Sequence, residues 1–468
     1  MVATKVLVEV PDERRECFEE FEALAASRQA AFSRAEALLE PVAGLGVELD
    51  DEVLPVPMLT ARHTPTTSVR RALAGFATPE QQPDLTAASM IVAAEVDDAR
   101  YDELCAREGV RVWPDSEIVL LGADPLGLRH SGVDEHDEDV LDLARSRPGV
   151  DCRPFRPGAD LATIRRLLGV EGVWQDGWRG QNVTVAVLDD GIDGSVYPVT
   201  GGFSRSGAQE PGSAAITSHG SMCAADVLVA APWARLEDYP FLGVPRSGGA
   251  LAMLQAVLDQ RRLTGTPHIT NNSWGFGGVP PRDRFPHHEV HDPDHPLHRK
   301  IREVVASGAA TFFAAGNCGQ DCPSATCHAS GIGPGQSIHA ANSLEEVITV
   351  AAVNHRHERI GYSSQGPGMF APAKPDLAAY THLFGNFGPG RPGGLDQPYD
   401  NGTSAACPVA AGVGALLLSA FPDLDPAGLR DALVAGAIQL GSEPWDADHG
   451  RGIVNAAASY THLRRGGA

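Results

Sequence analysis

Three short segments of the chain carry, in the order Asp, His, Ser, the side chains that nucleophilic hydrolysis needs. Asp189 ends an apolar segment, His219 stands between Ser218 and Gly220, and Ser404 lies in Asn-Gly-Thr-Ser-Ala-Ala. In such a triad the serine hydroxyl attacks a carbonyl carbon and the histidine accepts the hydroxyl proton. The aspartate holds the histidine in the required tautomer and stabilises the imidazolium. These segments therefore predict an acyl-transfer site.

The members of the triad lie at the ends of predicted elements. Residues 183–188 form an apolar, β-branched run, which is typical of a strand buried on both faces. Asp189 follows it, and open α/β sheets place their sites at the carboxyl ends of such strands. Ser404 precedes a run of small residues, 405–418, that predicts a helix. We expect Pro408 in its first turn, where proline is tolerated.

A second apolar run ends in an asparagine. Residues 309–315 predict another buried strand, and Gly316 and Asn317 follow it directly. An asparagine amide at this edge can donate a hydrogen bond to the oxyanion that forms on the attacked carbonyl. Because loss of one such donor typically lowers turnover by about 10²–10³, we assign Asn317 to the predicted catalytic site.

These four segments, in this order and at these intervals, resemble the subtilase family of serine peptidases, over residues 159–458. Five more segments resemble family signatures: 272–275, 347–353, 362–367, 374–379 and 450–456. The resemblance implies a serine endopeptidase that needs no cofactor for its chemistry. It also implies an α/β fold, with a subtilisin-like, mostly parallel sheet flanked by helices and a smaller N-terminal α+β domain.

The resemblance also assigns substrate-binding residues. Six residues are expected to hold the substrate backbone or line the primary pocket: Ser273, Trp274, Gly275, Ala315, Gly316 and Asp190. Asp190 and Trp274 resemble the kexin and furin branch, in which the second aspartate helps to select basic residues. A preference for basic residues therefore stays open.

Two functions of other classes use the same scaffold. A peptide transpeptidase or macrocyclase would carry the same triad and pass the acyl group to an amine instead of water. An inactive peptide-binding protein would keep the fold alone. The complete set Asp189, His219, Asn317 and Ser404 argues against the inactive protein.

Composition limits the partners. The chain has 468 residues, 43% of them hydrophobic, and a formal net charge of −23. This charge argues against nucleic acid or an anionic membrane as partner and leaves a protein or peptide substrate. No run approaches the roughly 18 apolar residues of a membrane-spanning helix, and the first residues do not resemble a signal peptide. We expect a cytoplasmic protein, or a secreted one if a leader has been removed.

The first part of the chain predicts a separate unit. Residues 1–121 alternate between strand-like and helical patterns, with one long helix expected over 13–39. This part resembles a subtilase propeptide, which implies that the chain's own N-terminal domain acts as inhibitor of a self-processed zymogen; an unrelated accessory domain is the alternative. Residues 122–158, rich in Gly, Pro and acid, are expected to be a solvated linker, followed by the peptidase domain at 159–468.

Three cysteines and a histidine lie close together beside Asn317: Cys318, Cys322, Cys327 and His328. Their side chains suit zinc, but the spacing is not that of a standard finger, so a local disulfide and plain reduced thiols stay open. The remaining cysteines, scattered along the chain, do not suggest a secreted disulfide scaffold. A histidine-rich stretch, 287–298, fits a solvent-exposed loop better than a metal site. Calcium is expected on the resemblance alone, without named ligands.

Two small residues border the triad. Cys223 lies one helical turn after His219, where the proteinase K branch has a free cysteine beneath the histidine. A small buried hydrophobe is the alternative role for this residue. Ala405 stands directly after the nucleophile, where many subtilases have an oxidisable methionine.

Overall fold

The computed structural model describes residues 3–11, 28–59, 87–121, 148–152, 159–204, 209–241, 244–384 and 400–466. The acidic run 134–139 and the expected helical residues 13–27 lie outside them. The chain forms two compact units: the first contains 1–117, 243–266 and 281–307, and the second contains 118–242, 267–280 and 308–468. The predicted domain limits 1–121, 122–158 and 159–468 stay a prediction.

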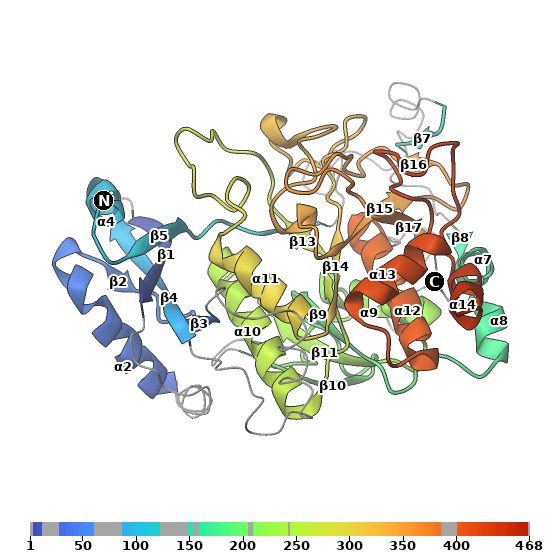
Figure 1. Ribbon diagram of the computed structural model, residues 1–468, viewed down its shortest axis with the longest axis horizontal. Coiled ribbons are helices and arrows are strands. Elements are labelled where there is room, and N and C mark those ends of the chain that lie inside the picture. Colours follow the sequence, from blue (N-terminus) through green and yellow to red (C-terminus); the bar gives the residue numbers. More distant parts are fainter. Residues whose placement is uncertain are drawn as a thin grey trace. The chain divides into compact units, whose positions relative to one another are not determined.

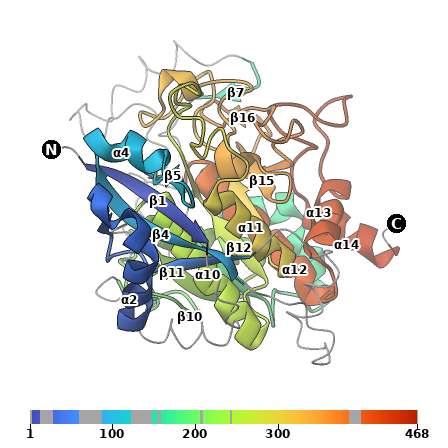
Figure 2. The same cartoon turned by 60° about the vertical axis from the view of Figure 1, so that its left-hand side comes forward.

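The first unit is built on an antiparallel sheet in the order β2-β4-β1-β5, with β3 paired to β4. Its strands are β1 (Ala3–Pro11), β2 (Glu48–Leu49), β3 (Val56–Leu59), β4 (Ala87–Asp97) and β5 (Arg111–Pro114). Two helices, α2 (Arg28–Leu39) and α4 (Asp98–Cys105), accompany it (Figures 1 and 2). Alternate residues of β1, such as Val6 and Val8, share one apolar core with Ala35 and Leu104 from these helices. This is the α+β pattern that the sequence predicts.

Buried polar contacts join this sheet to helices α10 (Ser247–Thr264) and α11 (Pro296–Ala306) of the same unit. The carboxylate of Glu9 on β1 accepts hydrogen bonds from Arg299 on α11, at 2.8 and 2.9 Å, and from the Trp113 indole at 3.1 Å. Lys300 donates to the Pro57 carbonyl at 2.7 Å. The N-terminal residues therefore contact α11 through specific partners.

A second polar cluster caps the start of α10. Asp115 accepts the Gly248 N–H at 2.7 Å, and its other carboxylate oxygen has no hydrogen-bond partner among the described residues. Burial raises the pKa of Asp115 to about 7; the Gly248 N–H opposes this shift, and nearby Glu289 adds to it. The fully buried Glu289 accepts hydrogen bonds from Ser116 and Ser247.

The histidine-rich stretch is not the solvent-exposed loop that the sequence suggested. His295 and His298 are fully buried. The Nδ1 atom of His295 accepts the Leu297 N–H at the start of α11, so its Nε2–H donates to the Pro114 carbonyl at 3.1 Å. Burial lowers the pKa of His295 and His298, so both rings stay neutral near neutral pH. Packing against residues 1–117 explains the difference.

The second unit contains a nine-stranded sheet in the order β10-β11-β9-β12-β14-β15-β16-β7, with β17 paired to β15. Its strands are β7 (Val150–Asp151), β9 (Thr184–Asp189), β10 (Val199–Gly202), β11 (Arg235–Pro240), β12 (Ile269–Asn272), β14 (Ala310–Ala314), β15 (Ile348–Val353), β16 (Arg359–Ile360) and β17 (Leu377–Tyr380). All pairs are parallel except β15 with β16. The predicted mostly parallel α/β sheet is confirmed.

Helices accompany this sheet: α7 (Leu161–Leu168), α8 (Val170–Gln175), α9 (His219–Ala230), α12 (Thr403–Ala420), α13 (Pro426–Ala435) and α14 (Ala456–Arg464). By length and composition α12 could cross a membrane, but 89% of it is buried inside the protein, as in a core helix. Helix α9 crosses it so closely that a Cβ atom on Gly412 would lie 2.2 Å from the Val227 carbonyl oxygen. Glycine is therefore required at this crossing.

Strand β7 lies within the predicted linker. It pairs with β16, and the next residue, Cys152, forms a disulfide with Cys322. Residues 150–152 thus belong to the sheet and its border, unlike the solvated linker expected over 122–158. Strand β16 and Cys322 are both far from residues 150–152 in the sequence, so composition alone could not predict that they hold this segment.

Candidate active site

Strand β9 and helix α9 bring Asp189 and His219 together. The Nδ1 atom of His219 lies 2.7 Å from the Asp189 carboxylate, which is fully buried. An ionised carboxylate only accepts hydrogen bonds, so Nδ1 carries the proton and Nε2 is left to serve as the base. This is the orientation that the predicted triad requires.

Cys223 lies beneath this pair and also touches the backbone of the nucleophile. Its Sγ atom is 3.6 Å from Asp189 Oδ2, 3.9 Å from His219 Nδ1 and 3.6 Å from the Ser404 carbonyl oxygen. Burial raises the pKa of the Cys223 thiol well above its usual value, so the thiol keeps its proton and can donate it to the carboxylate. The contacts place all three triad residues around one sulfur atom.

Ser404 is the second residue of α12 and is fully buried. Pro408 is the sixth residue of this helix, not a residue of the first turn as expected. A proline has no N–H, so the Ser404 carbonyl lacks its usual helical donor four residues on. The Ser273 hydroxyl donates to it instead, at 3.1 Å, and the Cys223 Sγ atom lies 3.6 Å from the same oxygen. The Ser404 hydroxyl donates to the Ser273 carbonyl at 3.4 Å.

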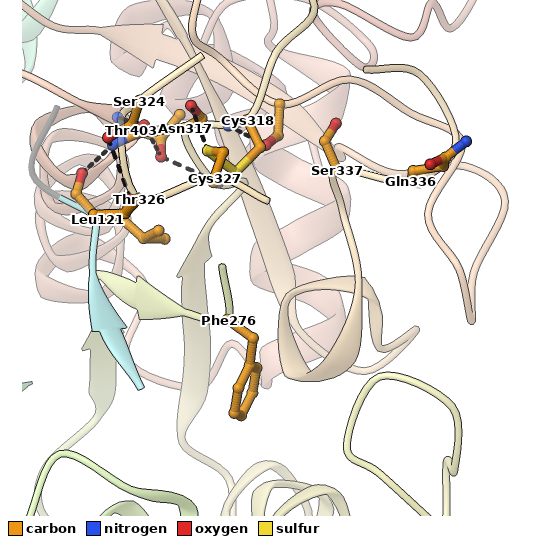
Figure 3. Close-up of a disulfide and its surroundings, with 12 residues drawn as sticks. Leu121, Phe276, Asn317, Cys318, Ser324, Thr326, Cys327, Gln336, Ser337 and Thr403 are labelled. Atoms are coloured by element: carbon orange, nitrogen blue, oxygen red, sulfur yellow. Dashed lines mark hydrogen bonds between the residues drawn. A yellow bond between two sulfur atoms is a disulfide. The ribbon is translucent and has the colours of Figure 1, made fainter. Parts of the chain in front are cut away.

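Asn317 follows β14 and faces the start of α12. Its Oδ1 atom accepts hydrogen bonds from the N–H and the hydroxyl of Thr403, both at 2.9 Å. These two donors fix the amide, so its Nδ2 must point the opposite way and can donate. It donates to the carbonyl oxygen of Leu121, which is the position that an oxyanion donor would take toward a substrate (Figure 3).

A segment of the chain itself lies along the predicted substrate edge. Strand β6 (Val119–Leu120) pairs antiparallel with β13 (Trp274–Gly275), and the Leu121 N–H donates to the Ser273 carbonyl at 3.1 Å. Leu121 is 5% exposed. Extended pairing of this kind is how a peptide adds to a sheet edge. The segment that ends at Leu121 is therefore bound in the way a peptide substrate would be.

The carboxylate of Asp190 is engaged at the start of α9. The carboxylate accepts the backbone N–H groups of His219, at 3.1 Å, and Gly220, at 2.6 Å, at the start of α9. Burial raises the pKa of Asp190 to about 6, and the charge of Asp189 adds to this shift. Asp190 caps the first N–H groups of α9 in this way, and its expected role in selecting basic residues stays a prediction.

The other expected substrate-binding residues contribute mainly their backbone. The Trp274 indole is fully buried and lies edge-on to Phe241 and Phe313, so its side chain belongs to the core. The Gly316 N–H donates to the Thr403 hydroxyl at 3.1 Å, and Ala315 is buried beside it. Ser273 and Gly275, in contrast, lie directly along the segment 119–121.

The cysteine cluster is not a zinc site in this structure. Cys318 is bonded to Cys327 and Cys322 to Cys152, so none of the three offers a thiolate, and His328 is exposed. The predicted local disulfide is thus present, while the expected lack of further disulfides is wrong for Cys152. Sequence spacing could not reveal the second bridge, because its cysteines are 170 residues apart.

Within the described part of the chain, one group of three or more His, Cys, Asp or Glu side chains converges closely enough to hold a metal ion. It consists of the predicted catalytic pair, Asp189 and His219, and the Cys223 thiol. It contains a single carboxylate, which does not fit calcium, a cation that takes six to eight oxygen ligands. Calcium therefore stays a prediction without named ligands.

Two residues near the site were missed by the sequence reasoning. The Tyr362 hydroxyl accepts the Gly402 N–H at 2.7 Å and so supports the turn before Ser404. It lies 2.9 Å from Nε2 of His382, whose pKa is lowered by burial to about 4, so that this ring is neutral and can accept the hydroxyl proton. Leu121 was taken only as the end of a domain; the apolar run 118–121 before Gly122 is the signal that could have identified it.

Comparison with known proteins agrees with this geometry. The sequence model of the subtilase family matches residues 180–457. The serine protease AprX of Bacillus subtilis is 27% identical over 321 residues, which are 60% of this chain and 66% of AprX. Subtilisin of Bacillus pumilus is 30% identical over 297 residues, 60% of this chain and 92% of that protein. The structure of fervidolysin from Fervidobacterium pennivorans matches with a TM-score of 0.55 and 18% identity, over 98% of this chain and 61% of fervidolysin.

The fold and the relatives define a subtilisin-like serine protease domain that needs no cofactor for its chemistry. The chain belongs to the subtilase family. It spans just under two thirds of AprX and of fervidolysin, so the comparisons cover part of those proteins.

Proposed function

We propose that the protein is a serine endopeptidase made as a zymogen, and that it cleaves its own chain between Leu121 and Gly122. Ser404 attacks the Leu121 carbonyl carbon, and His219 takes the serine proton and then gives it to the leaving amine of Gly122. Asp189 orients His219, and Asn317 stabilises the oxyanion. The observation that carries this proposal is the hydrogen bond from the Asn317 amide to the Leu121 carbonyl.

The same segment supports an apolar preference. Leu121 and Ile118 are 5% and 4% exposed, so both side chains are covered where the segment lies along β13. Asp190, the candidate for selecting basic residues, has its carboxylate engaged with the start of α9. We therefore propose peptide substrates with a leucine-like residue before the cleaved bond.

The N-terminal part is proposed to stay bound as an inhibitor after cleavage. Residues 1–117 contact α11 through Glu9 and Pro57 and the start of α10 through Asp115, while residues 118–121 lie along the substrate edge. After cleavage, the fragment 1–121 would thus still contact the helices through residues 1–117 and strand β13 through residues 118–121. Two disulfides also favour an oxidising compartment over the expected cytoplasm.

Intact mass of the purified protein tests these proposals, measured before and after reaction with a serine-reactive fluorophosphonate. We expect the wild type to be cut between residues 121 and 122 and to gain one adduct once a trace of another protease has degraded the bound N-terminal part, and Ser404→Ala to do neither. Ser419→Ala, at the far end of the same helix, is the matched control and should behave as wild type. A full-length chain without adduct, even after a trace of another protease has cut the region 122–158, would overturn the peptidase proposal.

A further inference from the structure

A disulfide lies directly beside the predicted oxyanion donor. Asn317 is followed by Cys318, which is bonded to Cys327, nine residues away (Figure 3). The Sγ atom of Cys327 lies 3.3 Å from the backbone carbonyl oxygen of Asn317. The bridge therefore contacts the residue whose amide must be held in place.

The loop closed by this bridge has no helix or strand of its own. Its residues return to Asn317 through one backbone hydrogen bond, from Ser324 to the Asn317 carbonyl at 2.9 Å. On the N-terminal side of Asn317, strand β14 already ends at Ala314. Gly316, with a φ of 111°, directly precedes Asn317. The Cys318–Cys327 bridge thus restrains the residue directly after the donor, together with the hydrogen bond from the Cys318 N–H to the Ser364 hydroxyl at 3.1 Å.

Correct placement matters because the amide has two tasks at once. Its Oδ1 atom must accept both Thr403 donors while its Nδ2 atom points to the carbonyl of the bound peptide. Oxyanion stabilisation depends on a donor held about 2.7–3.1 Å from the developing charge before the reaction begins. Movement of the Asn317 backbone would weaken the hydrogen bond to the oxyanion in the transition state. It would weaken the binding of the substrate backbone to β13 less.

We propose that the Cys318–Cys327 disulfide is a positioning element for Asn317, so that full peptidase activity requires this bridge to be closed. The inference rests on the proposed peptidase function. A dithiol reductant opens the bridge by supplying two electrons and two protons, which yields two thiols, while the dithiol itself closes to a disulfide. Oxidised glutathione restores the bridge by accepting the same electrons and protons.

The second disulfide offers a matched control. Cys152–Cys322 connects the residue after β7 to the same loop, but its cysteines have no contact with Asn317 among the described residues. We expect Cys318→Ser/Cys327→Ser to lower kcat by about tenfold or more with KM changed less than about twofold, since complete loss of an oxyanion donor costs about 10²–10³. Cys152→Ser/Cys322→Ser should keep kcat within about twofold.

A mutant cycle with Asn317→Ala shows whether the bridge acts through the asparagine. In that background, removal of Cys318–Cys327 should change the residual kcat less than about twofold, because the positioned group is already gone. Equal losses with and without the Asn317 side chain would refute a positioning role. An unchanged kcat for Cys318→Ser/Cys327→Ser would refute it as well.

Reduction provides a test that does not depend on the folding of that variant. In processed Cys152→Ser/Cys322→Ser protein, dithiothreitol is added until intact mass after alkylation shows the Cys318–Cys327 bridge open. A reversible fall in kcat, restored by oxidised glutathione, supports the inference, and full activity with the bridge open overturns it. Ser404→Ala separates this from the proposed function: activity that survives in Ser404→Ala would reject the peptidase assignment itself.

Discussion

The buried carboxyl group of Asp115 destabilises the folded protein when it becomes charged as the pH rises. We therefore expect Asp115→Asn to stabilise the protein, relative to the parent, more at high pH than at low pH. Burial raises its pKa from 3.8 to about 7 in the folded first unit. A raised carboxyl pKa means that the folded state binds more protons than the unfolded state between these two values. Stability is therefore lost as the pH rises from about 4 to about 7, and it is constant above that.

The size of the effect follows from the pKa difference. Three pKa units correspond to about 4 kcal/mol at pH 8, compared with about 0.5 kcal/mol at pH 4. Asparagine keeps an oxygen to accept the Gly248 N–H, and its amide nitrogen replaces the carboxylate oxygen that has no partner among the described residues. The buried amide adds a cost of about 1–2 kcal/mol that does not vary with pH. The difference between variant and parent should thus favour the variant by about 3–4 kcal/mol more at pH 8 than at pH 4.

Hydrogen exchange of the Ser404→Ala protein, which keeps the chain intact, measures this difference. The free energy of opening is taken from amides of β1 and β4 at both pH values, with and without Asp115→Asn. The neighbouring charged groups, such as Glu289 and Arg246, are the same in both proteins, so the difference between the two proteins reports chiefly on the replaced carboxyl group. Amides of β9 in the second unit are the internal control. If the free energy of opening depends on pH in the same way in both proteins, the claim that burial disfavours the charged form of Asp115 is refuted.

Three further predictions concern the catalytic centre. Asp190→Ala should destabilise the start of α9 by about 1–2 kcal/mol and lower kcat, with no change in the preference for leucine over arginine substrates; a changed preference would contradict the capping role. A stoichiometric mercurial should slow the wild type by displacing His219 but leave Cys223→Ala unaffected, and full activity of wild type labelled at Cys223 would refute this. Peroxide should inactivate the enzyme slowly, because Ala405 follows the nucleophile, whereas Ala405→Met should be inactivated faster; rapid loss in the wild type without cysteine oxidation would contradict it.

Much of the peptidase fold could be predicted because its signals are local. The run 183–188 has the apolar, β-branched character of a buried strand, and β9 ends at Asp189 as the sequence indicates. The resemblance to subtilases added the roles of His219, Asn317 and Ser404. His219 lies against Asp189, and Asn317 accepts hydrogen bonds from Thr403, the residue before Ser404, while the catalytic roles themselves stay predictions.

The remaining features depend on partners far apart in the sequence. Leu121 meets Asn317 across 196 residues, and Cys152 meets Cys322 across 170. The burial of His295 depends likewise on Pro114 and Trp113. The local composition around either residue of such a pair does not predict that the two residues come into contact. For this reason the histidine-rich stretch was interpreted as a solvent-exposed loop. The position of Pro408 was missed for a smaller reason: the helix begins two residues earlier than the small-residue run suggested.

The crossing of α9 and α12 at Gly412 has a consequence for how this enzyme can vary. His219, the predicted base, is the first residue of α9, and Ser404, the predicted nucleophile, is the second residue of α12. The two helix backbones meet at Gly412 without a side chain between them. The spacing of the catalytic atoms is thus set by backbone thickness. Surface loops and the peptide-binding edge can therefore change to suit new substrates while the distance between α9 and α12 stays the same. A single methyl group added at Gly412, two helical turns from Ser404, would change that distance.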